Sequence, residues 1–396
     1  MSQPTRPPFA AFSEVEHRAR LAAVRPKLRA ANIDVAISVA PEHQYYFGGY
    51  ESWTSAVSPQ ALIFATDDAR GGGEPTLIVR NVDLPLVRES SWVRDVRTYK
   101  LHVDDVPALI AGVAQEKGLG TSGTAGMETG SILLGLPLAR AIERALAPAL
   151  LVDAGPVLGA PRVVKSPTEM RYMRKAAEYA RAGLKAARKA AKPGVSEIAL
   201  AAELEAAMRR AGSDYWAITT ELASGPRTPG GHGAARQRIM QQGDLVHLEF
   251  AGVEHRYHAV TLHTMALGDP GKRAKELYEL TRRSLEEGEK ACRIGAAVAD
   301  VEEAALAPLR PAGLEAAFLM RFGYGIGIAY PPIWLEALEI CRESNQIMQA
   351  DTTFVLHSCI ELPEEGIGII QGGTYALTES GLELLTGGGS VPLEIL

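Results

Sequence analysis

The clearest alternation of apolar and polar residues in the chain lies between positions 245 and 265. Over residues 245–251, His247 and Glu249 point to one face of the predicted strand, and apolar residues point to the other. This is the two-residue period of a strand. Residues 252–255 suit a turn, and residues 256–265 alternate again. The pattern therefore predicts a β-hairpin with imidazole and carboxylate groups on one face.

The second strand of this hairpin also carries polar side chains on both faces. Its period places His258 and Val260 on one face, and Tyr257 and His263 on the other. Five of the nine histidines of the chain fall within residues 232–263. A buried polar group without a partner costs about 1–3 kcal/mol. A hairpin of this composition is therefore poor material for a plain hydrophobic core, and it indicates a functional site.

Strands and helices alternate along the first part of the chain. A capping box at Ser13 predicts a helix to Ala31, residues 34–40 read as a buried strand, and the aromatic residues 45–50 are expected to form a turn. A second capping box, Ser166-Pro-Thr-Glu169, predicts a helix over 166–192. Further helices are expected at 196–211, 271–294 and 298–310, and further strands at 352–360 and 372–378.

This order of elements predicts two domains. We expect a smaller α/β domain over residues 1–160 and an α+β domain over residues 161–396. A chain of 396 residues suits two domains better than one.

Composition excludes several classes of function. The net charge of -6 gives no basic surface for nucleic acid, and no run of apolar residues is long enough to cross a membrane. The first eight residues contain no apolar segment of the kind found in signal peptides, and the three cysteines are widely spaced. We therefore expect a cytoplasmic protein that binds neither nucleic acid nor membrane.

Several motifs, in order and at regular spacing, resemble the creatinase/aminopeptidase P/prolidase superfamily. This resemblance covers nearly the whole chain and implies a C-terminal pita-bread domain (the creatinase/aminopeptidase fold) behind an N-terminal creatinase-type domain. It also implies a homodimer. The motifs are Val164-Lys-Ser-Pro-Thr-Glu-Met170, Gly243-Asp-Leu-Val246, Arg256-Tyr-His258, Gly323-Tyr-Gly-Ile-Gly-Ile328 and Leu377-Thr-Glu-Ser-Gly381.

The resemblance also implies where metal ligands would lie. Peptidases of the superfamily hold two metal ions with two Asp, one His and two Glu. The matching positions here are Glu249, Val260, Tyr324, His357 and either Gln371 or Gly372. Valine cannot bind a metal ion and neutral tyrosine is a poor donor. We therefore predict no catalytic metal and no other cofactor; a single adventitious metal at His232, Glu249 and His357 is the alternative.

Two stretches are most similar to members of the superfamily that work without metal, namely ectoine hydrolase and creatinase. They are residues 249–258 and residues 323–334. The resemblance implies hydrolysis of a non-peptide C–N bond in a small zwitterionic metabolite, either a cyclic amidine or a guanidino acid. We expect a small-molecule substrate.

Three residues are candidates for catalysis. His232 stands in the loop Gly230-Gly-His-Gly233, where an imidazole can take and return a proton, and it matches the catalytic histidine of creatinase. Glu249 is expected either to face a cationic group or to attack the carbon of the bond; the plainer interpretation is a strand glutamate paired with an arginine such as Arg256. His357 is a second acid–base candidate.

Six further residues are candidates for substrate binding. His258 follows the family's site-facing position, with a buried, satisfied histidine as the alternative, and Tyr324 takes a former ligand position. Aromatic walls can hold a cation, with ordinary core packing as the alternative. Aromatic residues of the first domain cover the partner's pocket in creatinase-like dimers. These aromatic candidates are Tyr330, Trp334, Tyr50 and Trp53.

Three other functions fit the same motifs. The first is a metal-dependent Xaa-Pro peptidase with unusual ligands. The second is a pita-bread protein that binds partners without catalysis. The third is a lyase or a tailoring enzyme that uses the same pocket on another molecule.

Overall fold

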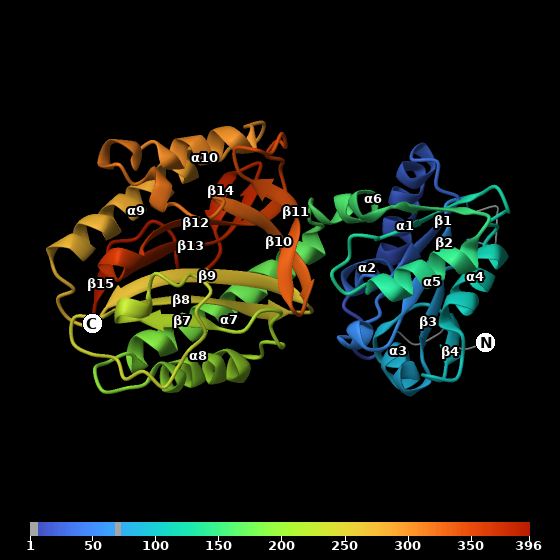
Figure 1. Ribbon diagram of the computed structural model, residues 1–396, viewed down its shortest axis with the longest axis horizontal. Helices are drawn as coiled ribbons and strands as arrows, with labels where there is room; N and C mark the ends of the chain where they lie inside the picture. The colour runs from blue at the N-terminus through green and yellow to red at the C-terminus, as the bar shows by residue number, and fades with distance from the viewer. Residues whose placement is uncertain (1–6, 68–72) are drawn as a thin grey trace. The chain divides into compact units, whose positions relative to one another are not determined.

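The chain folds into two compact units, Met1–Arg162 and Val163–Leu396 (Figure 1). The computed structural model describes residues 7–67 and 73–396. The division lies after Arg162, where the sequence placed it after residue 160. Within the described residues no helix is both long and apolar enough to cross a membrane.

The first unit is built on a six-stranded mixed sheet. Its strands are β1 (Val35–Ser38), β2 (Ala61–Ala65), β3 (Thr76–Arg80), β4 (Asp95–Tyr99), β5 (Thr124–Met127) and β6 (Leu150–Asp153). Their order is β4-β3-β2-β1-β5-β6. Its helices are α1 (Glu14–Ala30), α2 (Pro41–Gly48), α3 (Leu84–Ser90), α4 (Val106–Glu116), α5 (Leu136–Leu146) and α6 (Gly155–Gly159). The mixture of parallel and antiparallel pairs fits the predicted α/β domain.

The two faces of this sheet pack against different helices. Ile37 and Ile63 lie in one core with Ile110 of α4 and Ile142 of α5. On the other face, the ring of Phe47 in α2 lies 5.9 Å from that of Phe64 in β2.

The aromatic segment at 45–50 is helical for most of its length, so the predicted turn is wrong there. Residues 45–48 belong to α2, which begins with Pro41 in its first turn. The helix ends at Gly49, whose positive φ of 71° supplies the left-handed conformation that glycine adopts without strain. The aromatic side chains are buried, so packing decided the local structure.

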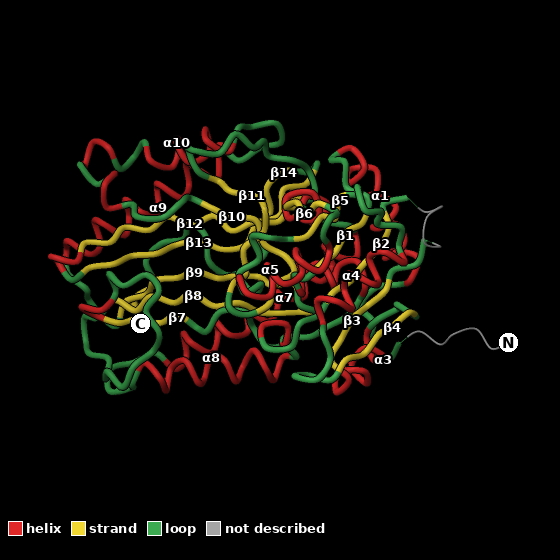
Figure 2. Tube along the Cα trace, turned by 45° about the vertical axis from the view of Figure 1, so that its right-hand side comes forward, coloured by secondary structure: helices red, strands yellow, loops and turns green. Residues whose placement is uncertain are grey.

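The second unit contains a nine-stranded sheet covered by two pairs of helices. Its strands are β7 (Glu221–Ser224), β8 (Leu245–Glu254), β9 (Tyr257–Ala266), β10 (Gly323–Tyr330), β11 (Ile333–Ile340), β12 (Thr352–Leu362), β13 (Ile367–Thr378), β14 (Gly381–Leu384) and β15 (Glu394–Ile395). Its helices are α7 (Pro167–Ala190), α8 (Glu197–Ala211), α9 (Lys272–Ala291) and α10 (Val298–Leu306). Figure 2 shows the main strands side by side in the order β11-β10-β12-β13-β9-β8-β7.

Helix α7 begins where the sequence predicts. Ser166 caps it and Glu169 returns the bond to the Ser166 backbone, so the capping box is confirmed. The helix ends at Ala190, two residues before the predicted end at Lys192.

The helices cover one face of the sheet and leave the other for the site. Leu248 and Phe250 of β8 pack against α7 and α8, while Phe354 and Leu356 of β12 pack in a core with α9 and α10. The intervening residues of β8 and β12 point to the opposite face. We call this the inner face.

The β8–β9 hairpin is confirmed, but its turn lies later than predicted. Both turn residues, His255 and Arg256, have positive φ (47° and 66°), as a tight two-residue hairpin turn requires. Gly252 lies inside β8 rather than in the turn. A Cβ atom at Gly252 would lie 2.1 Å from the Ala176 carbonyl oxygen, so glycine permits α7 to approach the strand closely.

Candidate active site

A cavity of about 170 Å³ lies in the second unit and gathers five of the nine predicted site residues. These are His232, Glu249, Tyr324, Trp334 and His357. The other residues lining it are Ile218, Glu221, Met320, Arg321, Ile333 and Leu335. Distant parts of the chain therefore bring imidazole, carboxyl, phenol and guanidinium groups together.

Two buried carboxyl groups lie opposite one another in this cavity. Glu221 of β7 pairs directly with Glu249 of β8, so both side chains project from the inner face. Burial, together with the negative charge of Glu249, raises the pKa of Glu221, and burial also raises the pKa of Glu249. The two groups are hydrogen-bonded to each other. One shared proton between them follows from this arrangement, because two like charges so close cannot both ionise at low cost.

The sequence analysis missed Glu221. β7 has four residues, Glu221–Ser224, too few to show a period. Its pairing with β8 is a long-range contact that composition does not reveal. The signal present in the sequence was a lone glutamate in a short apolar run before the glycine loop.

A hydrogen-bond chain fixes the other side of Glu249. The Trp334 indole Nε1 donates to the Tyr324 hydroxyl at 3.2 Å, and that hydroxyl donates to Glu249 Oε1 at 3.2 Å. Burial and the neighbouring Glu249 raise the pKa of Tyr324 far above its ordinary value. Tyr324 therefore stays a neutral donor, and it orients the carboxyl group of Glu249.

His357 of β12 faces the same cavity as a neutral base. Burial, reinforced by the positive charge of Arg321 and by the neighbouring His232, lowers its pKa to about 4. Its ring lies 5.9 Å from that of Tyr324. Its Nδ1 atom is buried without a hydrogen-bond partner among the described residues. This nitrogen is available to a bound molecule.

His232 reaches the cavity from an exposed glycine loop. The loop turns tightly, with the Gly233 amide donating to the Gly230 carbonyl at 2.9 Å. Ala234, two residues beyond His232, forms an antiparallel bridge with Glu221. At Gly231 a Cβ atom would lie 2.5 Å from Glu361 Oε1, so the Glu361 carboxyl group approaches the loop closely. The loop thus holds an exposed imidazole beside the carboxyl pair.

His258 and Tyr330 do not line the cavity. The His258 Nδ1 atom donates to the Arg256 carbonyl at 2.8 Å, and its Nε2 atom accepts from the Ala217 amide at 3.0 Å. Both nitrogens are therefore occupied by backbone, and burial lowers the pKa of His258 far below its usual value. The guanidinium carbon of Arg256 lies over the Tyr330 ring, 5.0 Å from the ring centre. The geometry gives both residues a structural task at the hairpin turn.

Tyr50 and Trp53 belong to the first unit. The Tyr50 side chain is buried, and its hydroxyl accepts from Gln60 Nε2 at 3.3 Å. Trp53 is 66% exposed. Their contribution to a partner's pocket stays a prediction.

The residues at the family's ligand positions do not fit a two-metal centre. Val260 is a buried aliphatic side chain. Strand pairing places Gly372 opposite His357 on the inner face, whereas Gln371 points outward and donates to a carbonyl of α9 at 3.0 Å. In residues 7–67 and 73–396 no three His, Cys, Asp or Glu side chains are grouped to hold a metal ion. Two of the five positions thus carry no donor toward the cavity.

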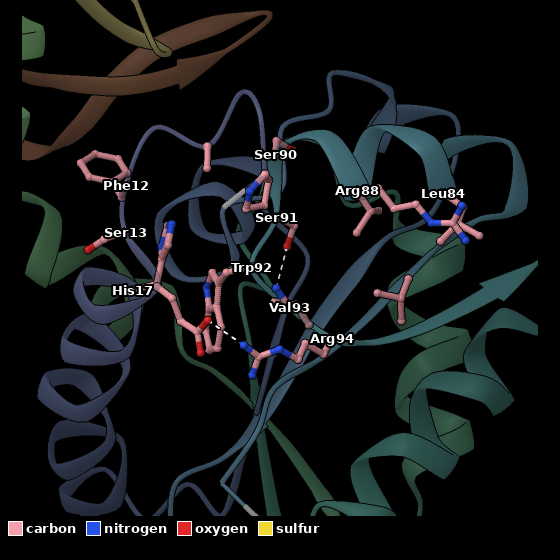
Figure 3. A pocket seen from close by; sticks show the side chains of 15 residues that line it. Phe12, Ser13, His17, Leu84, Arg88, Ser90, Ser91, Trp92, Val93 and Arg94 are labelled. Atoms are coloured by element: carbon pink, nitrogen blue, oxygen red, sulfur yellow. Dashed lines mark hydrogen bonds and ion pairs between the residues drawn. The ribbon is translucent and has the colours of Figure 1, made fainter. Parts of the chain in front are cut away.

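A second cavity, of about 620 Å³, lies in the first unit (Figure 3). Figure 3 shows the indole of Trp92 beside His17, whose ring stacks on it at 6.1 Å. Arg94 donates to Glu14 at 2.9 Å, and the Ser91 hydroxyl donates to the Gly48 carbonyl at 2.6 Å. Arg94 and Ser91 thus already have partners within the first unit, and the cavity lacks the carboxyl pair and the neutral base of the smaller cavity.

Comparison with known proteins identifies the family to which this chain belongs. The model of metallopeptidase family M24 matches residues 171–379, and that of the creatinase/prolidase N-terminal domain matches residues 20–164. The chain belongs to metallopeptidase family M24 and is a hydrolase of that family. The predicted superfamily and the predicted two-domain pita-bread fold are confirmed.

Individual relatives differ in the bond they cleave. The chain is 26% identical over 392 residues to an ectoine hydrolase of Halomonas elongata, covering 94% of this chain and 96% of the relative. It is 25% identical over 361 residues to an Xaa-Pro dipeptidase of Pyrococcus furiosus, covering 90% and 94%. A prolidase structure from Thermococcus sibiricus superposes with a TM-score of 0.85 at 19% identity, covering 97% and 100%.

Proposed function

We propose that this protein is a metal-independent hydrolase that opens a non-peptide C–N bond in a small zwitterionic metabolite. The substrate class is a cyclic amidine or a guanidino acid. The observation that carries the proposal is the buried Glu221–Glu249 pair, which lines a cavity together with two histidines, while Val260 and Gly372 stand at two of the family's metal-ligand positions. The similarity to an ectoine hydrolase supports it.

The carboxyl pair suits a cationic reacting group. An amidinium or guanidinium entering the cavity would contact Glu249. A positive charge next to a carboxyl group lowers its pKa and so favours the ionised carboxylate. Tyr324 keeps Glu249 oriented through its 3.2 Å hydrogen bond. The cation therefore replaces the proton that Glu221 and Glu249 otherwise share.

The two histidines suit the proton transfers. Water adds to the electrophilic carbon, and His232 accepts a proton from this water molecule. The C–N bond then breaks, and the protonated His232 returns that proton to the leaving nitrogen. His357, which is neutral at physiological pH, accepts a hydrogen bond at Nδ1 or donates one there, according to its tautomer, and so orients the water. The sum is one water added across one C–N bond.

The test is turnover of ectoine, creatine and a Xaa-Pro dipeptide by the purified protein, with and without a chelator. We expect chelator-resistant opening of an amidine or guanidine. The His232→Ala variant should lower turnover by about 10²–10⁴-fold while the thermal midpoint is retained. His255→Ala is the matched control, because His255 stands in the hairpin turn and does not line the cavity.

Two results would overturn the proposal. An unchanged rate in His232→Ala removes this histidine from the chemistry. A stoichiometric divalent ion that restores activity after chelation removes metal independence. The Xaa-Pro peptidase alternative, favoured by the similarity to an Xaa-Pro dipeptidase, predicts dipeptide cleavage that depends on such an ion.

A further inference from the structure

Arg321 gives the cavity a positive end. It lies two residues before the start of β10 and lines the same cavity as Glu221, Glu249 and His357. It is the one side chain of fixed positive charge among the described residues lining that cavity. It also lines a neighbouring cavity of about 350 Å³. Arg321 thus lines both the candidate active site and a second cavity.

Most of the hydrogen-bonding capacity of Arg321 is unused. Its Nη1 atom donates to Glu339 Oε1 at 2.7 Å, and in the part of the chain that the structure describes it makes no other hydrogen bond. A guanidinium has five N–H donors in a planar fork. Glu339 does not line the active-site cavity, and its side chain is 54% exposed. An exposed ion pair of this kind contributes little to stability, so the stability of the fold does not account for Arg321.

The charge of Arg321 acts inside the cavity. It is one of the causes that hold the pKa of His357 low. The guanidinium carbon lies 6.0 Å from the centre of the Tyr324 ring, and the hydroxyl of that ring contacts Glu249. One small cavity therefore has a guanidinium over the ring of Tyr324 and a carboxyl pair at the hydroxyl group of that residue. This is a charge pattern complementary to a zwitterion.

We propose that Arg321 binds the carboxylate of the substrate and thereby selects for zwitterions over simple cations. The planar fork can hold a carboxylate through two parallel N–H···O bonds. With the carboxylate held there, the cationic part of a short molecule faces Glu249. The inference rests on the proposed function for the nature of that cationic part, and it makes Arg321 a residue that determines specificity.

The experiment measures binding and turnover with matched acid and ester probes. Ectoine and creatine are compared with their ethyl esters, which keep the cation and lose the carboxylate charge. Calorimetry gives affinity, and initial rates give kcat and KM separately. The wild-type protein should bind each acid about 10–100-fold more tightly than its ester, as expected for hydrogen bonds between charged groups.

Three variants isolate the contribution of Arg321. Arg321→Met should abolish the preference for the acid and raise KM by about 10–100-fold, with a smaller change in kcat. Arg321→Lys should restore part of the preference, because charge is kept while the planar fork is lost. Glu339→Gln removes the same ion pair and leaves the guanidinium in place, so it should retain the wild-type preference.

The outcomes separate this inference from the proposed function. Equal binding of acids and esters by the wild-type protein overturns the inference, as does an unchanged preference in Arg321→Met. Loss of the preference in Glu339→Gln as well overturns it too, since the ion pair would then explain the effect. A further result would be that the wild-type protein binds the acid more tightly, that Arg321→Met loses this preference, and that neither probe is turned over. That result supports the inference and contradicts the proposed function.

Discussion

Two polar clusters lie on the same sheet, and they differ in how completely their hydrogen bonds are satisfied. At the hairpin turn, the Arg256 guanidinium is fully buried, donates to the Ala329 and Tyr215 carbonyls, and lies 3.7 Å from the centre of the Tyr215 ring. In the cavity, Glu221 and Glu249 face each other with a buried His357 whose Nδ1 atom has no partner among the described residues.

The difference distinguishes polar groups that stabilise the fold from polar groups that can bind a ligand. A buried cation whose donors all reach backbone carbonyls can hold a turn, but it has little left with which to meet a ligand. A buried carboxyl pair that must share a proton costs stability, and groups shifted in this way cluster at functional sites. Both clusters look alike in the sequence, since both are polar residues in apolar strands.

The largest expected effect comes from removing the charge of Glu249. Glu249→Gln should lower turnover by about 10³–10⁴-fold, because the cationic group loses its carboxylate partner. The same change should leave the thermal midpoint unchanged or higher, since it ends the repulsion with Glu221. Initial rates and a thermal melt measure the two quantities.

Glu197→Gln is the matched control for that variant. Glu197 is also fully buried, yet it accepts from the Ser224 amide at 2.9 Å and from the Arg236 amide at 2.9 Å, and it pairs with Arg227. Its substitution should cost about 1–3 kcal/mol of stability. A stability loss in Glu249→Gln as large as that in Glu197→Gln would contradict the distinction between the two clusters.

The second largest expected effect is a loss of stability when Arg256 at the hairpin turn is replaced. Arg256→Met should lower the free energy of unfolding by about 2–4 kcal/mol, because two carbonyl groups lose their buried donors. The remaining folded protein should keep its kcat within about tenfold, since Arg256 does not line the cavity. Urea unfolding, monitored by circular dichroism, measures the change in the free energy of unfolding.

The control for Arg256→Met is an exposed arginine. Arg174 pairs with Glu383 where both side chains are 47% exposed, so Arg174→Met should change stability by less than about 1 kcal/mol. If Arg256→Met proved as mild as Arg174→Met, the turn cluster would not hold the hairpin.

The smallest effect is on the pH dependence of stability. Burial raises the pKa of both Glu221 and Glu249 above the ordinary value of 4.5, and the negative charge of Glu249 raises that of Glu221 further. Above pH 4.5 the folded state therefore binds more protons than the unfolded state, so stability falls as the pH rises. Glu221→Gln removes one titrating group. It should be more stable than wild type at pH 8 by about 1 kcal/mol, or about 2–4 °C.

That difference should shrink toward pH 5, where both carboxyl groups are protonated in the folded state. His247 and His357, whose pKa values are lowered to about 4 by burial, add the opposite slope between pH 4 and 6.5. They are present in both proteins and cancel in the comparison. Parallel stability curves for the two proteins from pH 5 to pH 8 would show that the pKa of Glu221 is not raised in the folded state.

The sequence was sufficient for features that are encoded locally. The capping box at Ser166 begins α7, and the period-two pattern predicted the two strands of the β8–β9 hairpin, which the strand pairing confirms. The features it missed depend on long-range packing. Glu221 joins the site through the register of β7 with β8, and Gly252 could not be separated from the turn without the approach of α7.

The same limit applies to side chains whose partners are backbone atoms. His258 follows the pattern of a site residue, but its two nitrogens are taken by Arg256 and Ala217. The sequence also left Gln371 and Gly372 as alternatives, and the strand register places Gly372 on the inner face. A shift of one residue in pairing exchanges the two faces of a strand.

Gly372 also decides how this scaffold could be redesigned. A Cβ atom there would lie 2.2 Å from the Leu356 carbonyl oxygen and 2.7 Å from the His357 Cα atom. Converting this chain into a dinuclear metalloenzyme by adding the missing glutamate would therefore require the backbones of β12 and β13 to separate first. Sterically, the route back to a metal cage is closed to any single substitution at this position.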